Sequence, residues 1–203
     1  MNIALIGASG NVGSRILAEA LRRGHKVIAI ARDAGKIATA DNVTARSADV
    51  KDTASLAAAI SGADVVVSSG RFANFKAADV LPALKQAGVK RLAVVGGAGS
   101  LQIAPGKALI DTPEFPAEYK PEASAGREFL NDLRAENEIE WTFLSPSALF
   151  VAGERTGKFR LGTDQLLAAA DGKSWISYED YAIALLDELE QPRHVRARFT
   201  VGY

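Results

Sequence analysis

Three glycines, each separated from the next by two other residues, stand directly after the first apolar segment of the chain. Gly7, Gly10 and Gly13 follow residues 2–6 and precede a helical pattern. In this setting Gly7 allows a tight turn, Gly10 removes a Cβ where a phosphate would approach, and Gly13 lets the helix pack closely on the strand. A strand, a glycine turn and a helix in this order aim backbone N–H groups at one point, which suits a pyrophosphate. The alternative is a purely structural glycine-rich turn in another kind of α/β protein.

The residues after the glycine turn have the period of an amphipathic helix. Apolar side chains recur at helical spacing on one face, at Val12, Ile16, Leu17, Ala20 and Leu21. Gly24 is placed to end this helix, and residues 26–30 have the composition of a second strand. The motif therefore lies in the strand–turn–helix–strand order that a dinucleotide-binding unit requires.

The end of the second predicted strand indicates which dinucleotide is bound. An acidic residue there holds the ribose 2′-hydroxyl of NAD, whereas an arginine accommodates the 2′-phosphate of NADP. Arg32 comes first and could pair with a phosphate, and Asp33 follows, where it could cap the next turn. We therefore favour NADP(H) over NAD(H); an inward-facing Asp33 would restore NAD binding.

Strand and helix patterns alternate along most of the chain. This alternation predicts an α/β, Rossmann-like, doubly wound and mostly parallel sheet with helices on both faces, in a single domain spanning residues 1–203. Residues 151–203 would form a small C-terminal elaboration near the substrate site, with a hairpin around Thr156 and Gly157. The predicted strands are residues 2–6, 26–30, 42–48, 64–68, 91–95, 141–145 and 198–201, and the predicted helices are residues 52–60, 76–87, 122–137, 164–170 and 179–189, besides the first.

Composition limits the classes of function. The chain has 203 residues with 48% hydrophobic and 24% charged side chains, which is typical of a globular domain. A formal net charge of zero argues against a nucleic-acid partner, and the absence of cysteine excludes disulfides and thiolate metal sites. No apolar run approaches the roughly 20 residues that span a bilayer, and no signal peptide is evident. We expect a cytoplasmic monomer or homodimer with no metal, no nucleic acid and no membrane partner.

Several longer segments resemble a known family. They are residues 7–13, 141–147, 153–162 and 174–182, together with the tail 198–203. On these segments the chain resembles the NADH-flavin reductase-like group of the atypical short-chain dehydrogenase/reductases, which is similar to the biliverdin-IXβ/flavin reductases. The glycine turn is shared by many families, whereas the later segments are more specific.

The resemblance implies a Rossmann-type domain that binds NAD(P)H. The turn Gly7, Ala8, Ser9, Gly10, Asn11, Val12 and Gly13 would hold the phosphates, Arg32 the adenosine phosphate, and Asp49 and Val50 the adenine. Ser69, Gly70 and Arg71 would run beneath the nicotinamide ribose, and Pro146 and Ser147 would lie against the nicotinamide. Gly96 and Gly97 follow the fifth predicted strand, so we place them at the same carboxyl edge, where ligands of open α/β sheets bind.

The acid–base pair of alcohol-oxidising short-chain dehydrogenases is missing. Those enzymes need a tyrosine and a lysine four residues later, but Ala123 stands four residues after Tyr119. This argues against an alcohol dehydrogenase or a sugar epimerase. Tyr119 could still be a weak proton donor or a surface tyrosine, and Ser100 could bond an acceptor carbonyl or be a turn serine.

Reduction of a flavin or quinone does not need that pair, because the acceptor ring delocalises the charge and water supplies the proton. The sequence thus predicts an NAD(P)H-dependent reductase with a small conjugated acceptor, the flavin being a substrate. A non-catalytic NADP(H) sensor is the alternative, and an isomerase or reductase of a small natural product is a third. Four phenylalanines could line the acceptor site or simply pack in loops: Phe72, Phe75, Phe115 and Phe150. Three basic residues could attract an anionic acceptor or form a solvated face: Arg155, Lys158 and Arg160. The long connection formed by residues 106–120 could cover the site.

Overall fold

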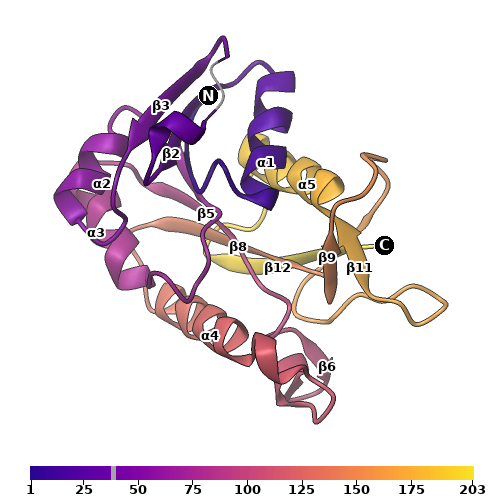
Figure 1. Cartoon of the computed structure of the whole chain (residues 1–203). Coiled ribbons are helices and arrows are strands. Elements are labelled where there is room, and N and C mark those ends of the chain that lie inside the picture. Colours follow the sequence, from indigo (N-terminus) through magenta and orange to yellow (C-terminus); the bar gives the residue numbers. More distant parts are fainter. Residues whose placement is uncertain (38–39) are drawn as a thin grey trace.

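The computed structural model describes residues 1–37 and 40–203, and its backbone forms alternating strands and helices (Figure 1). The principal strands are β1 (Asn2–Ile6), β2 (Lys26–Ala31), β3 (Val43–Ser47), β4 (Val65–Ser68), β5 (Arg91–Val95), β8 (Glu140–Pro146), β10 (Arg160–Gly162) and β12 (Ala197–Gly202). The helices are α1 (Asn11–Arg22), α2 (Thr53–Ile60), α3 (Ala77–Ala87), α4 (Lys120–Arg134) and α5 (Tyr178–Glu190). Short strands β6 (Gln102–Ala104) and β7 (Lys107–Ala108) pair with each other, as do β9 (Leu149–Val151) and β11 (Trp175–Ser177).

One eight-stranded sheet organises the molecule, in the order β10-β12-β8-β5-β4-β1-β2-β3. Every neighbouring pair in this sheet is parallel except β10 with β12, which is antiparallel. The strand order reverses beside β1, so the crevice at the carboxyl ends of β1 and β4 is the expected ligand position. The predicted doubly wound, mostly parallel α/β fold is confirmed.

Helices cover both faces of the sheet. Helices α1 and α5 lie side by side on one face, and α2, α3 and α4 cover the other (Figure 1). Side chains of β1 alternate between the two cores: Ile3 and Leu5 pack beneath α1 and α5, whereas Ala4 and Ile6 pack beneath α2 and α3. The central strands are therefore apolar on both faces, which is typical of a buried parallel sheet.

The helix ends follow the signals in the sequence. Asp52 caps α2 by accepting a hydrogen bond from the backbone N–H of Ser55 at 3.0 Å. Gly24 after α1 and Gly88 after α3 have positive φ angles of 78° and 70°, which glycine adopts at little cost. These caps set where each chain segment turns back toward the sheet.

Two predicted elements of the C-terminal part are wrong. Residues 164–170 do not form a helix, because this segment runs alongside β6: the Gln102 N–H donates to the Asp164 carbonyl at 2.8 Å, and the Leu166 N–H donates to the Gln102 carbonyl at 2.9 Å. Thr156 and Gly157 do not form a hairpin, because their backbone N–H groups both donate to the carboxylate of Asp180 at 2.8 Å. Long-range partners therefore replace the local hydrogen bonds that the predictions assumed.

Candidate active site

The glycine turn after β1 is built by close backbone contacts. Gly7 has φ of 81°, and a Cβ there would lie 2.7 Å from the Ser69 carbonyl oxygen. A Cβ on Gly13 would lie 2.0 Å from the Gly7 carbonyl oxygen, so only glycine lets α1 approach the turn this closely. Gly10 differs: it is the N-cap of α1, and a Cβ there meets only the Gly7 carbonyl oxygen, at 3.2 Å. The space in front of Gly10 is thus left open.

The turns after the first four strands enclose a pocket of about 490 Å³, which we call the N-terminal pocket. The predicted cofactor residues in its lining are Gly7, Ser9, Gly10, Arg32, Asp49, Val50, Ser69, Gly70 and Arg71. Ala8 and Gly13 are buried beneath the turn, and Asn11 and Val12 begin α1 outside this lining. The polar residues that the sequence analysis did not name are Lys51 and Asn74, which neighbour predicted segments.

The charges of the N-terminal pocket suit an anion. Its lining holds three cations, Arg32, Lys51 and Arg71, against the single carboxylate of Asp49. The first turn of α1 contains no acidic residue, so the partial positive charge of this helix end is open to a phosphate. Asp33 lies outside the lining, and its carboxylate accepts a hydrogen bond from the Gly35 N–H at 3.1 Å. Asp33 therefore has the predicted capping role.

A second and larger hollow, of about 810 Å³, lies at the carboxyl ends of β5 and β8; we call it the central pocket. The predicted site residues in its lining are Gly96, Gly97, Ser100, Tyr119, Pro146 and Ser147, and Arg71 lines both pockets. A Cβ on Gly96 would lie 2.3 Å from the ring of Phe143 and 2.8 Å from the Leu144 carbonyl oxygen. That oxygen accepts a hydrogen bond from the Tyr181 hydroxyl at 2.6 Å, and burial raises the pKa of Tyr181 so that it stays a donor.

Ser100 has a buried cation behind it. The Arg198 guanidinium of β12 donates to the hydroxyl oxygens of Ser100 and Ser145, both at 3.4 Å. Asp164 neutralises Arg198, with 2.8 Å between its carboxylate and Nε. Because the Ser100 oxygen already accepts from Arg198, its own hydrogen can be donated into the central pocket.

Helix α4 brings Tyr119 and Ala123 to the central pocket without a lysine. Tyr119 immediately precedes α4 and is 61% exposed. Ala123 lines the pocket one turn later, and a Cβ on Gly99 would lie only 2.8 Å from the Ala123 Cβ. The loop at Gly99 and helix α4 touch at position 123, where other dehydrogenases of this kind have a lysine. The small side chain of Ala123 allows this close packing.

Glu122, which the sequence analysis did not single out, connects the two pockets. Its carboxylate oxygens accept hydrogen bonds from the backbone N–H groups of Phe72 at 2.8 Å and Ala73 at 3.0 Å. It thereby ties the segment after β4 to the first turn of α4. The contact joins residues 50 positions apart, and no short-range pattern indicates it.

Each of the four phenylalanines lines one of the two pockets, and three of them also pack against other aromatic rings. Phe72 and Phe75 are buried against Phe129, with ring centroids 5.2 Å and 5.9 Å from it. Phe150 packs on Tyr181 at 4.7 Å while lining the central pocket, which Phe115 lines too. Phe72 also lines the central pocket, and Phe75 lines the N-terminal pocket.

The basic side chains of residues 155–160 do not line either pocket. Arg155 binds the buried carboxylate of Glu19 with two hydrogen bonds of 2.8 Å and 2.9 Å. These bonds, opposed in part by burial, lower the pKa of Glu19. Arg160 donates to the backbone carbonyl of Ala168 at 2.7 Å. Of the two roles considered for these side chains, attraction of an anionic acceptor therefore finds no support in the positions of Arg155 and Arg160, which are bound elsewhere.

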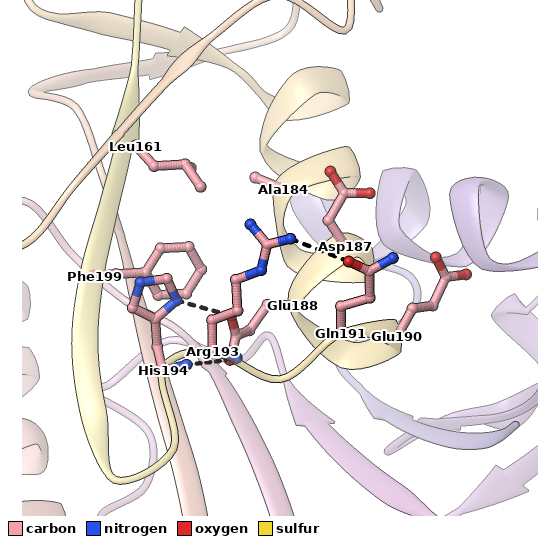
Figure 2. Close-up of a pocket in the computed structure, with 9 residues that line it drawn as sticks. All are labelled: Leu161, Ala184, Asp187, Glu188, Glu190, Gln191, Arg193, His194 and Phe199. Atoms are coloured by element: carbon pink, nitrogen blue, oxygen red, sulfur yellow. Dashed lines mark hydrogen bonds and ion pairs between the residues drawn. The ribbon is translucent and has the colours of Figure 1, made fainter.

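A third hollow, of about 320 Å³, lies where α5 turns into β12 (Figure 2). Its wall includes Glu188, which is buried and accepts hydrogen bonds from the backbone N–H of His194 at 2.8 Å and from its ring Nδ1 at 2.8 Å. The His194 ring stacks on Phe199 with 4.1 Å between centroids (Figure 2). Glu188 thus closes the turn before the last strand.

Among the residues that the structure describes, no group of three or more His, Cys, Asp or Glu side chains could hold a metal ion. In the same part of the chain, none of the helices combines the length and apolar character needed to cross a membrane.

The model of an NAD(P)H-binding family matches residues 7–192 of this sequence. The chain belongs to this family. Its NAD(P)H-binding, oxidoreductase-like character agrees with the glycine turn and the cationic N-terminal pocket, and the resemblance to the atypical short-chain dehydrogenase/reductases is confirmed.

Similar proteins cover the whole of this NAD(P)H-binding chain. The uncharacterized protein YwnB of Bacillus subtilis is 46% identical over 99% of this chain and 98% of its own length. A proposed epimerase from Bacteroides thetaiotaomicron is 44% identical, with a TM-score of 0.93 and coverage of 100% of this chain and 96% of its own. A proposed NADH-flavin reductase from Streptococcus pneumoniae is 37% identical, with a TM-score of 0.82 and coverage of 100% and 99%.

Proposed function

We propose that the protein is an NADPH-dependent reductase that passes a hydride to a conjugated ring, such as a flavin or a quinone. The observation that carries this proposal is the meeting of two pockets at Arg71. A cationic pocket with a glycine cradle adjoins a larger pocket walled mainly by apolar groups, at the same edge of the sheet. A dinucleotide whose phosphates lie at the glycine turn would present its other end to the central pocket.

The residues of the N-terminal pocket fit NADP(H). Gly10 leaves space in front of the α1 N-terminus for a pyrophosphate, and Arg32 offers a guanidinium to the 2′-phosphate. Bound NADPH would supply the hydride, and the acceptor would take that hydride together with one proton from water, gaining two electrons. The protein then contributes mainly proximity and orientation, which can be worth roughly 7–11 kcal/mol.

Three residues of this chain would bind or position the acceptor. The Ser100 hydroxyl would donate a hydrogen bond to an acceptor carbonyl, with Arg198 holding its oxygen from behind. Tyr119 would form part of the pocket wall. Glu122 would keep the segment after β4 in place between the two ligands.

The test is oxidation of NADPH by the purified protein with a panel of flavins and quinones. Loss of the reduced-nicotinamide absorbance that depends on both protein and acceptor supports a reductase, and Ser100→Ala should lower kcat with little change in NADPH affinity. Tight NADPH binding without oxidation across the panel would contradict the proposal.

That second outcome would favour a non-catalytic NADP(H) sensor. The observation in its favour is Ala123, whose position leaves the site without the lysine that dehydrogenases of this fold use for acid–base work.

A further inference from the structure

We propose that the central pocket selects acceptors without formal negative charge, so that riboflavin is accepted in preference to its phosphate ester, FMN. This inference rests on the proposed function, because it concerns the molecule that is reduced there. It narrows the acceptor to neutral, planar, conjugated rings.

The shape and the walls of the central pocket favour a flat apolar ring. Its volume of about 810 Å³ lies within the range of small-molecule sites. Aromatic and aliphatic residues make up much of the wall, namely Phe72, Leu109, Phe115, Pro116, Tyr119, Leu149, Phe150 and Leu166. Such a surface binds a ring by burying apolar area and by stacking, neither of which requires a charge on the ligand.

Each cation at this pocket has a carboxylate nearby. Arg127 pairs with Asp111 at 2.9 Å, and Arg71 lies 3.8 Å from the carboxylate of Glu122. Arg198, behind Ser100, is held by Asp164. A phosphate would have to compete with a carboxylate for each guanidinium, which removes most of the gain from pairing.

One carboxylate of the pocket wall has no cationic partner among the described residues. Glu114 lines the central pocket and forms no ion pair with any residue that the structure describes. The positive end of α4, which could otherwise attract an anion, carries Glu122 in its first turn. The charged side chains of the lining are Arg71, Glu114, Glu122 and Arg127, which sum to zero, and Glu114 is the one among them without an ion-pair partner in the described part of the chain. The lining therefore offers an anionic acceptor no net positive charge, and the carboxylate of Glu114 repels it.

The N-terminal pocket provides the contrast within the same molecule. It has three cations against one carboxylate, as expected for a phosphate-bearing ligand. The central pocket has no such excess, although both pockets lie at the same edge of the sheet. The chain thus separates a site for a phosphate-rich molecule from a site for an uncharged one.

The first experiment compares riboflavin with FMN, which share one ring system and differ by a phosphate. We expect kcat/KM with NADPH to be about fivefold higher for riboflavin at low ionic strength, because like charges repel over roughly a Debye length, which is about 30 Å at 0.01 M salt. The difference should shrink as salt is raised from about 0.01 M to 1 M, since the Debye length falls from about 30 Å to about 3 Å. Equal or better use of FMN at low salt would overturn the inference.

A binding measurement separates this inference from the proposed function. The fluorescence of each flavin is titrated with protein in the presence of oxidised NADP, so that no turnover is needed. If no acceptor oxidises NADPH, the proposed function fails, while tighter binding of riboflavin than of FMN would still support a neutral-ring site. If FMN binds as tightly as riboflavin, or if neither flavin binds, the inference fails.

A variant at Glu114 tests the source of the selection. Glu114→Gln should raise kcat/KM for FMN about twofold to threefold and leave that for riboflavin unchanged, because only the repulsion of the phosphate is removed. Glu118→Gln is the matched control, since Glu118 is an exposed carboxylate nearby that does not line the central pocket. An equal response to both flavins, or to both variants, would contradict a local charge effect.

Discussion

At the scale of single residues, the end of β2 carries the choice between the two nicotinamide coenzymes. Arg32 lines the N-terminal pocket, whereas Asp33 uses its carboxylate to cap the following turn through the Gly35 N–H. A guanidinium facing the pocket can pair with a 2′-phosphate and has no comparable partner on a 2′-hydroxyl. The preference for NADPH is therefore a prediction about one side chain.

We expect Arg32→Ala to weaken NADPH binding by about tenfold or more, because a charge-assisted hydrogen bond contributes about 1.5–3 kcal/mol. NADH binding should change little. Calorimetric titration of both coenzymes measures the difference, with Lys26→Ala as the control, because Lys26 is an exposed cation at the opposite end of the same strand. Equal losses for NADPH and NADH would rule out Arg32 as the phosphate partner.

Another residue-scale prediction concerns Glu19 of α1, which is buried and binds Arg155 and Arg23. The hydrogen bonds from Arg155 help hold its pKa below the ordinary value of 4.5. A carboxylate with a lowered pKa stabilises the folded state above its unfolded-state pKa, and this contribution is lost as pH falls through the folded-state pKa.

Glu19→Gln should accordingly lower the free energy of unfolding by about 2 kcal/mol at neutral pH, since charge-assisted hydrogen bonds are lost. The difference from the wild type should shrink as pH falls below 4.5. Urea unfolding at several pH values measures it, and Glu128→Gln, at an exposed glutamate of α4, is the helical control. A difference that stays constant with pH would show that shape, not charge, is responsible.

At the scale of elements, the glycines of the turn between β1 and α1 have different roles: we expect one to serve coenzyme binding and another to serve the stability of the fold. We expect Gly10→Val to abolish NADPH binding with a smaller loss of stability than Gly13→Val, because its Cβ would meet only the Gly7 carbonyl oxygen, at 3.2 Å, which a small shift can relieve. Gly13→Val should instead destabilise the fold by about 1–3 kcal/mol or more, because its Cβ would overlap that same carbonyl. Thermal unfolding and coenzyme titration of both variants give the result; a stable Gly13→Val protein would contradict this division.

The elements that could be predicted from sequence are those with local signals. Residues up to 146 alternate apolar strands with amphipathic helices, and Asp52 and Gly24 give caps at the observed ends. Between 150 and 175 the chain is held by distant partners instead, such as Asp180 on Thr156 and Arg198 on Asp164. A pattern of neighbours along the chain cannot reveal such contacts, so the predicted hairpin and helix were wrong there.

The site divides in the same way. The glycines and Arg32 follow strand ends, so the rule that ligands bind at the carboxyl edge located them. Lys51 directly follows the predicted Asp49 and Val50, whereas the places of Glu122 and Glu114 on a pocket wall depend on how α4 and the loops pack. Charge balance in a pocket is consequently a property that only the folded chain displays.

At the scale of the whole molecule, one sheet supports both pockets. The lining of the N-terminal pocket comes from residues 6–75, and that of the central pocket from residues 71–174. The C-terminal part adds β12 and β10 to the main sheet, while β9 and β11 form a separate pair beside it (Figure 1). Whether residues 151–203 unfold together with the main sheet is a direct test of the single-domain prediction.

The two tryptophans of the chain can report on these parts separately. Trp141 lies on β8 and is buried in the main core, whereas Trp175 lies on β11 with its ring centroid 4.3 Å from that of Tyr203. We expect Trp141→Phe and Trp175→Phe, each retaining one tryptophan, to give urea transitions that coincide with their own far-ultraviolet circular dichroism transitions. Coincidence is expected because β12 pairs with β8 of the main sheet and the Tyr181 hydroxyl of α5 donates to the Leu144 carbonyl of β8 at 2.6 Å, so that neither part can open without exposing the other. An earlier transition at Trp175 alone would identify residues 151–203 as a separately unfolding unit, and the acceptor pocket that they help to wall would then open before the coenzyme pocket.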